Sequence, residues 1–256
     1  MPEAAEASRR QRYLRAMQVD VWLRRGQRPQ GCAETAAFAP DEDKSAAIEA
    51  RGIEARSPVA GATEVAAMPL AELESTVAAC QNCDLHRDRT RTVFGTGDAQ
   101  ARCMIIGEAP GAEEDRTGEP FVGRAGQLLN AMLHAIGISR EAVYIANIIK
   151  CRPPKNRDPN ADEMLACSAY LGRQIALVKP RVIVAVGRVA AQHLTGSTLA
   201  IGRMRGQSYF YENSDNGAKI PIVVTYHPAY LLRSPLEKRK SWEDLRRVRQ
   251  LLESDG

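Results

Sequence analysis

Four short apolar runs limit the fold of this chain more than any other sequence feature. The runs lie at 102–107, 143–149, 182–186 and 220–225. Helical patterns separate them, near 124–137, 161–178 and 188–195. Strands that are apolar throughout are buried on both faces, which is typical of a parallel sheet between two helix layers. We therefore predict an α/β fold with a central parallel four-stranded sheet and helices on both faces.

The final helix carries its own start signal. Ser234 is a candidate N-cap, Pro235 suits the first helical position, and Glu237 stands where a capping box needs an acid. We expect Ser234 to cap a helix that runs to the end of the chain.

The first 68 residues differ from the rest of the chain in composition and in hydrophobic periodicity. Residues 8–25 have the spacing of a short amphipathic helix. The stretch from 26 to 68 loses this periodicity and is rich in alanine, which is typical of a linker. We predict an N-terminal extension over 1–68 and one domain over 69–256.

Positive charge is concentrated in the second part. The chain has 35 Lys and Arg against 31 Asp and Glu, a net charge of +4. Residues 150–157 hold basic side chains and no acid, and 233–249 are also rich in Lys and Arg. Clustered basic residues beside loops suit a phosphate backbone, although a solvated helix face has the same composition.

Four of the six cysteines are spaced as ligands: Cys80, Cys83, Cys151 and Cys167. A two-residue gap lets two thiolates face one centre, and two distant thiolates complete a set of four. The spacing favours an iron–sulfur cluster and leaves zinc or unrelated core thiols open. Cys103, inside a strand, and Cys32, in the linker, are not expected to be ligands.

An acidic glycine-rich loop, Gly107 to Asp115, follows the first strand. Glycines permit close backbone approach to a ligand, but the acids repel phosphate, so a nucleotide cradle is disfavoured. A neutral planar ligand stacked on Phe121 suits this loop better. The alternative is that Phe121 only fills the core.

Two polar residues stand at the ends of other strands. Asn147 offers an adjacent donor and acceptor, the pattern needed to recognise the edge of a base, although an Asn there can also form a turn. His227 can donate to a developing oxyanion. Sites of α/β proteins lie at the carboxyl ends of strands, so these residues are expected to share a site.

The tip that follows His227 carries an apolar pair before a base. Leu231 and Leu232 precede Arg233, so the two leucines could insert into a DNA duplex while Arg233 binds a phosphate. The alternative is the ordinary first turn of a helix.

The combination of GEAPGAEED, GEPFVGRAGQLL, NIIKCRPPKNRDPN and YHPAYLLR with the four cysteines strongly resembles the family 4 uracil-DNA glycosylases. These iron–sulfur enzymes match from about residue 70 to 250. The resemblance implies the three-layer sandwich of that superfamily. It also implies a monofunctional hydrolase that flips uracil out of DNA, cleaves its N-glycosidic bond and leaves an abasic site, initiating base excision repair.

The resemblance also assigns roles. Cys80, Cys83, Cys151 and Cys167 would hold a [4Fe–4S] cluster. Phe121 would stack on uracil, Asn147 would recognise its edge, and Gly107 and Ala109 would shape the site. Glu108 and Glu114 would line it, with Glu114 excluding the thymine methyl, and His227 would stabilise uracil O2. Lys150, Arg152, Lys155, Leu231, Leu232 and Arg233 would contact DNA.

Two features of the motifs refine this expectation. Many superfamily members place an Asp where this chain has Ala109, so the residue that positions the water is open between Glu108 and Glu114. A related subgroup traps DNA through a His in a basic loop, but no His lies between Lys150 and Cys167. Covalent trapping is therefore not expected.

The remaining expectations concern setting and partners. The N-terminus lacks a signal-peptide core and no run is long enough for a membrane span, so we expect a cytoplasmic protein. The partner would be uracil-containing DNA, single- or double-stranded, bound by a monomer. The extension could contact another repair protein. The alternative function is a non-catalytic iron–sulfur module for DNA binding or redox transfer.

Overall fold

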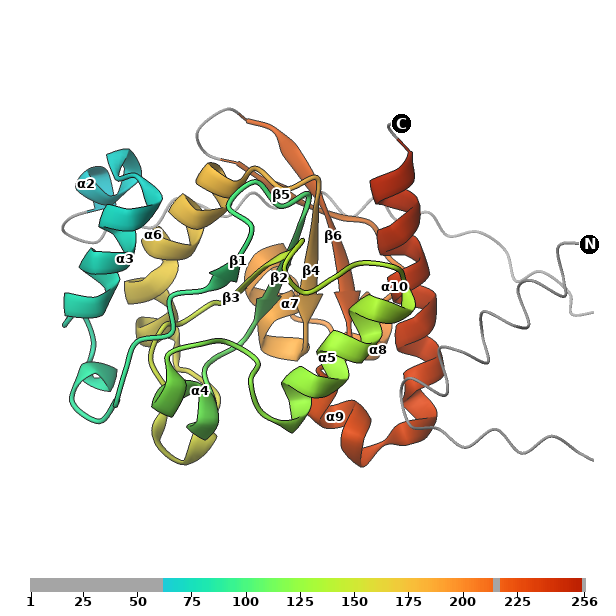
Figure 1. The fold of residues 1–256 in the computed structure, drawn as a ribbon, viewed down its shortest axis with the longest axis horizontal. Coiled ribbons are helices and arrows are strands. Elements are labelled where there is room, and N and C mark those ends of the chain that lie inside the picture. The colour runs from blue at the N-terminus through green and yellow to red at the C-terminus, as the bar shows by residue number, and fades with distance from the viewer. Residues whose placement is uncertain (1–61, 214–216, 255–256) are drawn as a thin grey trace, which may run out of the picture.

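The computed structural model describes residues 62–213 and 217–254 (Figure 1). The helix predicted at 8–25 and most of the predicted linker lie outside the described residues. The linker prediction fails at its end, because Ala62–Ala67 form helix α2 and Val65 is buried in the core. The folded part therefore begins before residue 69.

Six strands form one mixed sheet in the order β1-β3-β2-β4-β6-β5. The four inner strands are parallel: β2 (Cys103–Gly107), β3 (Tyr144–Asn147), β4 (Val182–Val186) and β6 (Lys219–Thr225). Two antiparallel strands close the edges, β1 (Thr96–Gly97) and β5 (Tyr209–Glu212). The predicted parallel core is confirmed, but the strand count is wrong. The edge strands escaped prediction because β1 is very short and β5 alternates in exposure.

Helices cover both faces of the sheet (Figure 1). On one face lie α2, α3 (Leu70–Ala79), α6 (Ala161–Val178), α7 (Arg188–Thr195) and α8 (Ile201–Met204). On the other lie α5 (Arg124–Ala135), α9 (Pro228–Arg233) and α10 (Lys238–Glu253). The connections carry α4 (Ala112–Thr117) and three short 3₁₀ turns, η1 (Asp84–His86), η2 (Pro154–Asn156) and η3 (Pro235–Glu237).

Alternation along each inner strand explains the two layers. Met104 and Ile106 of β2 pack into the core that contains α6, whereas Cys103 and Ile105 pack into the core that contains α5. Both sets are almost fully buried. A strand covered on both faces has no polar positions, which is why the sequence shows an unbroken apolar run.

Two element ends differ from prediction. Strand β3 stops at Asn147, although the amides of Ile148 and Ile149 still donate to the carbonyls of Gly107 and Glu108. The Ser234 side chain makes no cap hydrogen bond, and η3 precedes α10. A 3₁₀ turn satisfies the early backbone groups there in place of a side-chain cap.

Within residues 62–213 and 217–254, no helix combines the length and apolar character that crossing a bilayer requires.

Candidate active site

The carboxyl ends of the parallel strands meet at one edge of the sheet. Gly107 ends β2, Asn147 ends β3, and His227 follows β6 after two residues. A cavity of about 460 Å³ opens at this edge. Among the residues that line it are predicted members of the site, namely Glu108, Ala109, Glu114, Phe121, Asn147, His227 and Arg233. The structure therefore brings the predicted chemistry together from three separate parts of the chain.

The floor of the cavity depends on a close approach at Gly107. Gly107 pairs with Asn147 in the register of β2 and β3. A Cβ on Gly107 would lie 2.5 Å from Asn147 Oδ1 and 2.7 Å from Phe121 Cζ, distances that carbon atoms do not tolerate. Gly107 is thus not a lining residue itself but lets the amide and the ring meet beneath the cavity.

Asn147 is buried, with only 2% of its surface exposed. Its Oδ1 accepts no hydrogen bond from any described residue. A buried acceptor without a partner is costly, by about 1–3 kcal/mol, and calls for an explanation. Because Asn147 lines the cavity, a ligand that donates a hydrogen bond there would satisfy it.

The backbone of Phe121 is held in an unusual conformation, with φ at 54°. Arg140 donates to the carbonyls of Pro120 and Phe121 at 2.6 and 3.3 Å. Glu114 Oε1 accepts from the amides of Val122 and Gly123 at 3.0 and 3.2 Å. A strained residue persists when its neighbours fix it from both sides. The buried ring is therefore presented to the cavity in one defined position.

His227 has its protonation form set by the first turn of α9. The Ala229 amide donates to His227 Nδ1 at 3.1 Å, so Nδ1 is an acceptor and a neutral ring carries its proton on Nε2. Burial, with help from the nearby Arg233, lowers the pKa of His227 to about 4. The ring centroid lies 5.6 Å from that of Phe121. His227 is thus a neutral Nε2–H donor at physiological pH.

Glu108 has a carboxyl neighbour, Asp158, in the cavity wall. Burial, followed by the charge of Asp158 and a hydrogen bond to it, raises the pKa of Glu108 to about 7. Arg188, at the start of α7, forms an ion pair with Asp158 and opposes this rise. Glu108 consequently changes its charge near neutral pH.

The predicted DNA contact of Lys150 is wrong. Only 1% of Lys150 is exposed, and its Nζ donates to the Asn147 carbonyl at 2.8 Å and to Gln174 Oε1 at 2.6 Å. Burial lowers its pKa to about 7. Its neighbours Arg152 and Lys155 do reach the surface of the same loop. The basic cluster in the sequence therefore combines one interior residue with a surface loop.

The predicted wedge role of Leu231 is also wrong, whereas that of Leu232 stays a prediction. Leu231 is fully buried, and Leu232 is partly buried against the same core. Leu231 lies on the inner face of α9, the alternative that the sequence left open. Beyond α9, Leu236 in η3 is an exposed apolar residue, 90% exposed, while Tyr230 and Arg233 of α9 line the cavity.

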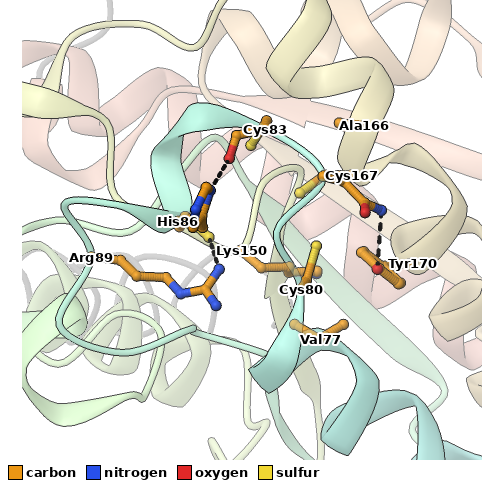
Figure 2. A pocket seen from close by; sticks show the side chains of 11 residues that line it. Val77, Cys80, Cys83, His86, Arg89, Lys150, Ala166, Cys167 and Tyr170 are labelled. Carbon is orange, nitrogen blue, oxygen red and sulfur yellow. Dashed lines mark hydrogen bonds between the residues drawn. The ribbon is translucent and has the colours of Figure 1, made fainter.

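Cys80, Cys83, Cys151 and Cys167 line a second, smaller cavity. Figure 2 shows the thiols of Cys80, Cys83 and Cys167 directed toward a common space, with Arg89 and Lys150 beside it. Arg89 Nη1 donates to Cys151 Sγ at 3.2 Å. In the described part of the chain no three His, Cys, Asp or Glu side chains are grouped so that they could hold a single metal ion.

Protonated thiols are poor metal ligands, and burial favours the protonated form by raising the pKa of these cysteines. Burial raises the pKa of Cys83 and of Cys151, and that of Cys167 to about 12. Arg89 opposes the rise at Cys83 and Cys151, and Lys150 opposes it at Cys167. The positive charges of Arg89 and Lys150 would thus stabilise negative charge on the thiolates. Cys103 lies apart, in β2, as expected for a core thiol.

Three residues that matter to the site were missed by the sequence analysis. Asp158 was overlooked because it directly follows the basic residues 150–157. The signal that could have identified it is that residues 148–160 contain no other acid. Arg140 and Arg188 act on site residues from the chain before β3 and from α7. No local pattern identifies such long-range partners.

Comparisons with known proteins agree with this geometry. The model of the uracil DNA glycosylase superfamily matches residues 94–246. A type-4 uracil-DNA glycosylase of Archaeoglobus fulgidus is 41% identical, over 71% of this chain and 92% of its own length. Enzymes of the same name from Saccharolobus solfataricus and Thermotoga maritima are 46% and 42% identical, over 68% and 69% of this chain and 82% and 91% of their own lengths.

The family model covers the chain from β1 into α10, and the strand ends hold the predicted residues. This chain therefore belongs to the uracil-DNA glycosylase superfamily and, within it, to the type-4 enzymes.

Proposed function

We propose that this protein hydrolyses the N-glycosidic bond of uracil in DNA and leaves an abasic site, the first step of base excision repair. The unpartnered Oδ1 of buried Asn147 carries this proposal. Uracil presents an N3–H donor beside an O4 acceptor, and an amide side chain matches both. Cytosine presents the reverse pattern at these two positions, so the amide distinguishes the two bases.

A base inside a duplex cannot reach this buried amide. The uracil must rotate out of the helix, at a cost of a few kcal/mol. Phe121, fixed by Arg140 and Glu114, would offer its ring to the face of the extruded base. Glu114 lines the same cavity and would exclude the thymine methyl group. Gly107 and Ala109 would shape the space around the base.

Bond cleavage separates a cationic sugar from an anionic base. As the C1′–N1 bond breaks, negative charge develops on uracil O2, and a neutral Nε2–H of His227 would donate to it. One such donor contributes about 3 kcal/mol to the transition state. The neutral form avoids the desolvation cost of burying a charged imidazolium. Glu108 lines the cavity and is a candidate for positioning the attacking water.

The four thiols would hold a [4Fe–4S] cluster. Four cysteines from the α3–η1 region, the β3–η2 loop and α6 line one cavity, and an all-thiolate set suits such a cluster. The cluster would fix the loop between β3 and α6, which carries Arg157 and Asp158 to the cavity.

DNA would lie across the mouth of the cavity. Arg152, Lys155 and Arg233 would bind its phosphates. Leu236 would enter the stack where the uracil leaves, because it is the exposed apolar side chain beyond α9. We further propose that the enzyme acts as a cytoplasmic monomer and that residues 1–68 contact another repair protein.

A DNA-binding or redox module is the alternative function. Such a module would need the thiols and the basic loop but would have no use for a cavity with a strained aromatic ring and an unsatisfied amide. Both features are present, and they favour the glycosylase.

We expect His227→Ala to lower the single-turnover rate of uracil excision about 10²-fold or more, because a donor to the leaving base is lost. The measurement is alkaline cleavage of a labelled oligonucleotide with one uracil, beside a thymine oligonucleotide. His134→Ala, an exposed position of α5, is the control and should retain the rate. A wild-type enzyme that leaves uracil intact contradicts the proposed function, and a fully active His227→Ala enzyme contradicts the role of His227.

Replacing Cys83 by Ala should abolish visible absorbance and lower the thermal midpoint, because one cluster ligand is missing. The wild-type protein is expected to contain about four irons and four sulfides per chain. Cys103→Ala removes a buried thiol outside the set, and its iron content should stay normal. A colourless wild-type protein with one zinc per chain would refute the cluster.

Leu236→Ala tests the wedge. We predict a roughly tenfold lower excision rate on duplex DNA, about 1.4 kcal/mol, with little change on single-stranded DNA, which needs no wedge. Leu199→Ala is the control, as an exposed leucine that does not line the cavity. Equal losses on both substrates, or none on the duplex, would rule out this role for Leu236.

A further inference from the structure

Two carboxyl groups share one wall of the active-site cavity. Glu108 follows β2, and Asp158 lies in the loop between η2 and α6, so sequence positions fifty apart become neighbours. The two carboxyl groups lie within hydrogen-bond reach of each other. Two carboxylates cannot share a hydrogen bond unless one of them carries a proton. A single proton on this pair would therefore be shared between Glu108 and Asp158.

A third residue acts on this pair from outside the cavity. Arg188 stands at the first position of α7, directly after β4, and its Nη2 forms an ion pair with Asp158 Oδ2. It also donates to Gln192 Oε1 at 3.1 Å, which orients the guanidinium along α7. The positive charge of Arg188 favours the ionised form of Glu108.

We propose that Glu108 and Asp158 form a proton-sharing carboxyl pair that accepts the proton of the attacking water, and that Arg188 sets the pH at which the pair becomes ready. This inference rests on the proposed glycosylase activity.

The step balances without another reactant. The water oxygen forms a bond to C1′, and the C1′–N1 electron pair leaves with uracil, whose O2 accepts from His227 Nε2–H. One water proton passes to the ionised Glu108, and the uracil anion later takes a proton from solvent. The products are uracil and an abasic sugar. The reactive form of the pair has Glu108 deprotonated, so the rate should rise with pH through the titration of Glu108.

Burial and Asp158 raise the pKa of Glu108 to about 7, and Arg188 opposes the rise. The other ionisable groups that line the cavity are Glu114, Arg157, Tyr230, Arg233 and His227. His227, with its pKa lowered to about 4, is already neutral throughout this range. Burial also lowers the pKa of Lys150 to about 7, but Lys150 donates to Asn147 and Gln174 and does not line this cavity. Because Glu108→Gln keeps Lys150, loss of the limb in that variant assigns the limb to Glu108.

The test is the pH dependence of single-turnover excision between pH 5 and 9 on a saturating single-stranded substrate. Asp158→Asn removes the neighbouring charge, so the midpoint should fall by roughly half a pH unit or more. Arg188→Gln removes the opposing charge, so the midpoint should rise by a similar amount. Half a unit corresponds to about a threefold change in relative rate at pH 6. Glu108→Gln should lose the limb altogether.

Arg249→Gln is the matched control, because it breaks an exposed ion pair with Glu253 on α10, far along the chain from the site. Its midpoint should equal that of the wild type. Opposite shifts in the Asp158 and Arg188 variants establish the pair, since a merely structural role would not move the midpoint in two directions. If both midpoints stay unchanged or move in the same direction while excision is intact, the carboxyl-pair proposal is wrong but the glycosylase activity is not contradicted. Absent wild-type excision would overturn the proposed function itself.

Discussion

The parallel pairing of β2 with β3 is the constraint on which the whole site depends. This pairing sets Gly107 opposite Asn147 and leaves no room for a side chain at position 107. The ring of Phe121 fills the same small space from above. A one-residue slip in register would separate the amide from the ring and exchange the side chains of β3 between the two helix layers. Every later contact of the cavity is built on this arrangement.

One buried side chain, Lys150, links the cysteine cavity to the active-site cavity by a hydrogen bond. Lys150 lies beside Cys151 and Cys167, lines the cysteine cavity, and donates to the Asn147 carbonyl. Gln174 fixes the other side of the ammonium and donates onward to the Phe94 carbonyl at 2.9 Å. Ionised thiolates would favour the charged form of Lys150, which donates to the Asn147 carbonyl. The cysteine cavity and the candidate active site are parts of one packed structure.

The sequence predicted the inner strands well because each is buried on both faces and shows an unbroken apolar run. It also placed Phe121, Asn147 and His227 in one site, since strand ends of a parallel sheet meet at one edge. It failed for Lys150 and Leu231, because composition does not tell which side of a loop or helix faces the core. Charge clustering suggested a surface lysine, yet a buried network holds it.

The residues that the sequence could not supply act over long distances. Arg140 holds the backbone of Phe121, and Arg188 reaches Asp158 from the start of α7. Neither residue belongs to a local motif, so only the folded chain reveals its role. Edge strand β5 escaped for a related reason, because its exposure alternates and its partner β6 lies beyond a turn.

The central claim is that Asn147 recognises the edge of an extruded uracil, and its most direct test is a change of base preference. Asn147→Asp replaces the amide donor by an acceptor, which suits the amino group of cytosine. Excision should be measured on matched single-stranded oligonucleotides with one uracil or one cytosine. The account predicts a strong loss of uracil excision and a gain in the cytosine-to-uracil ratio. Unchanged uracil excision with an unchanged ratio would contradict it.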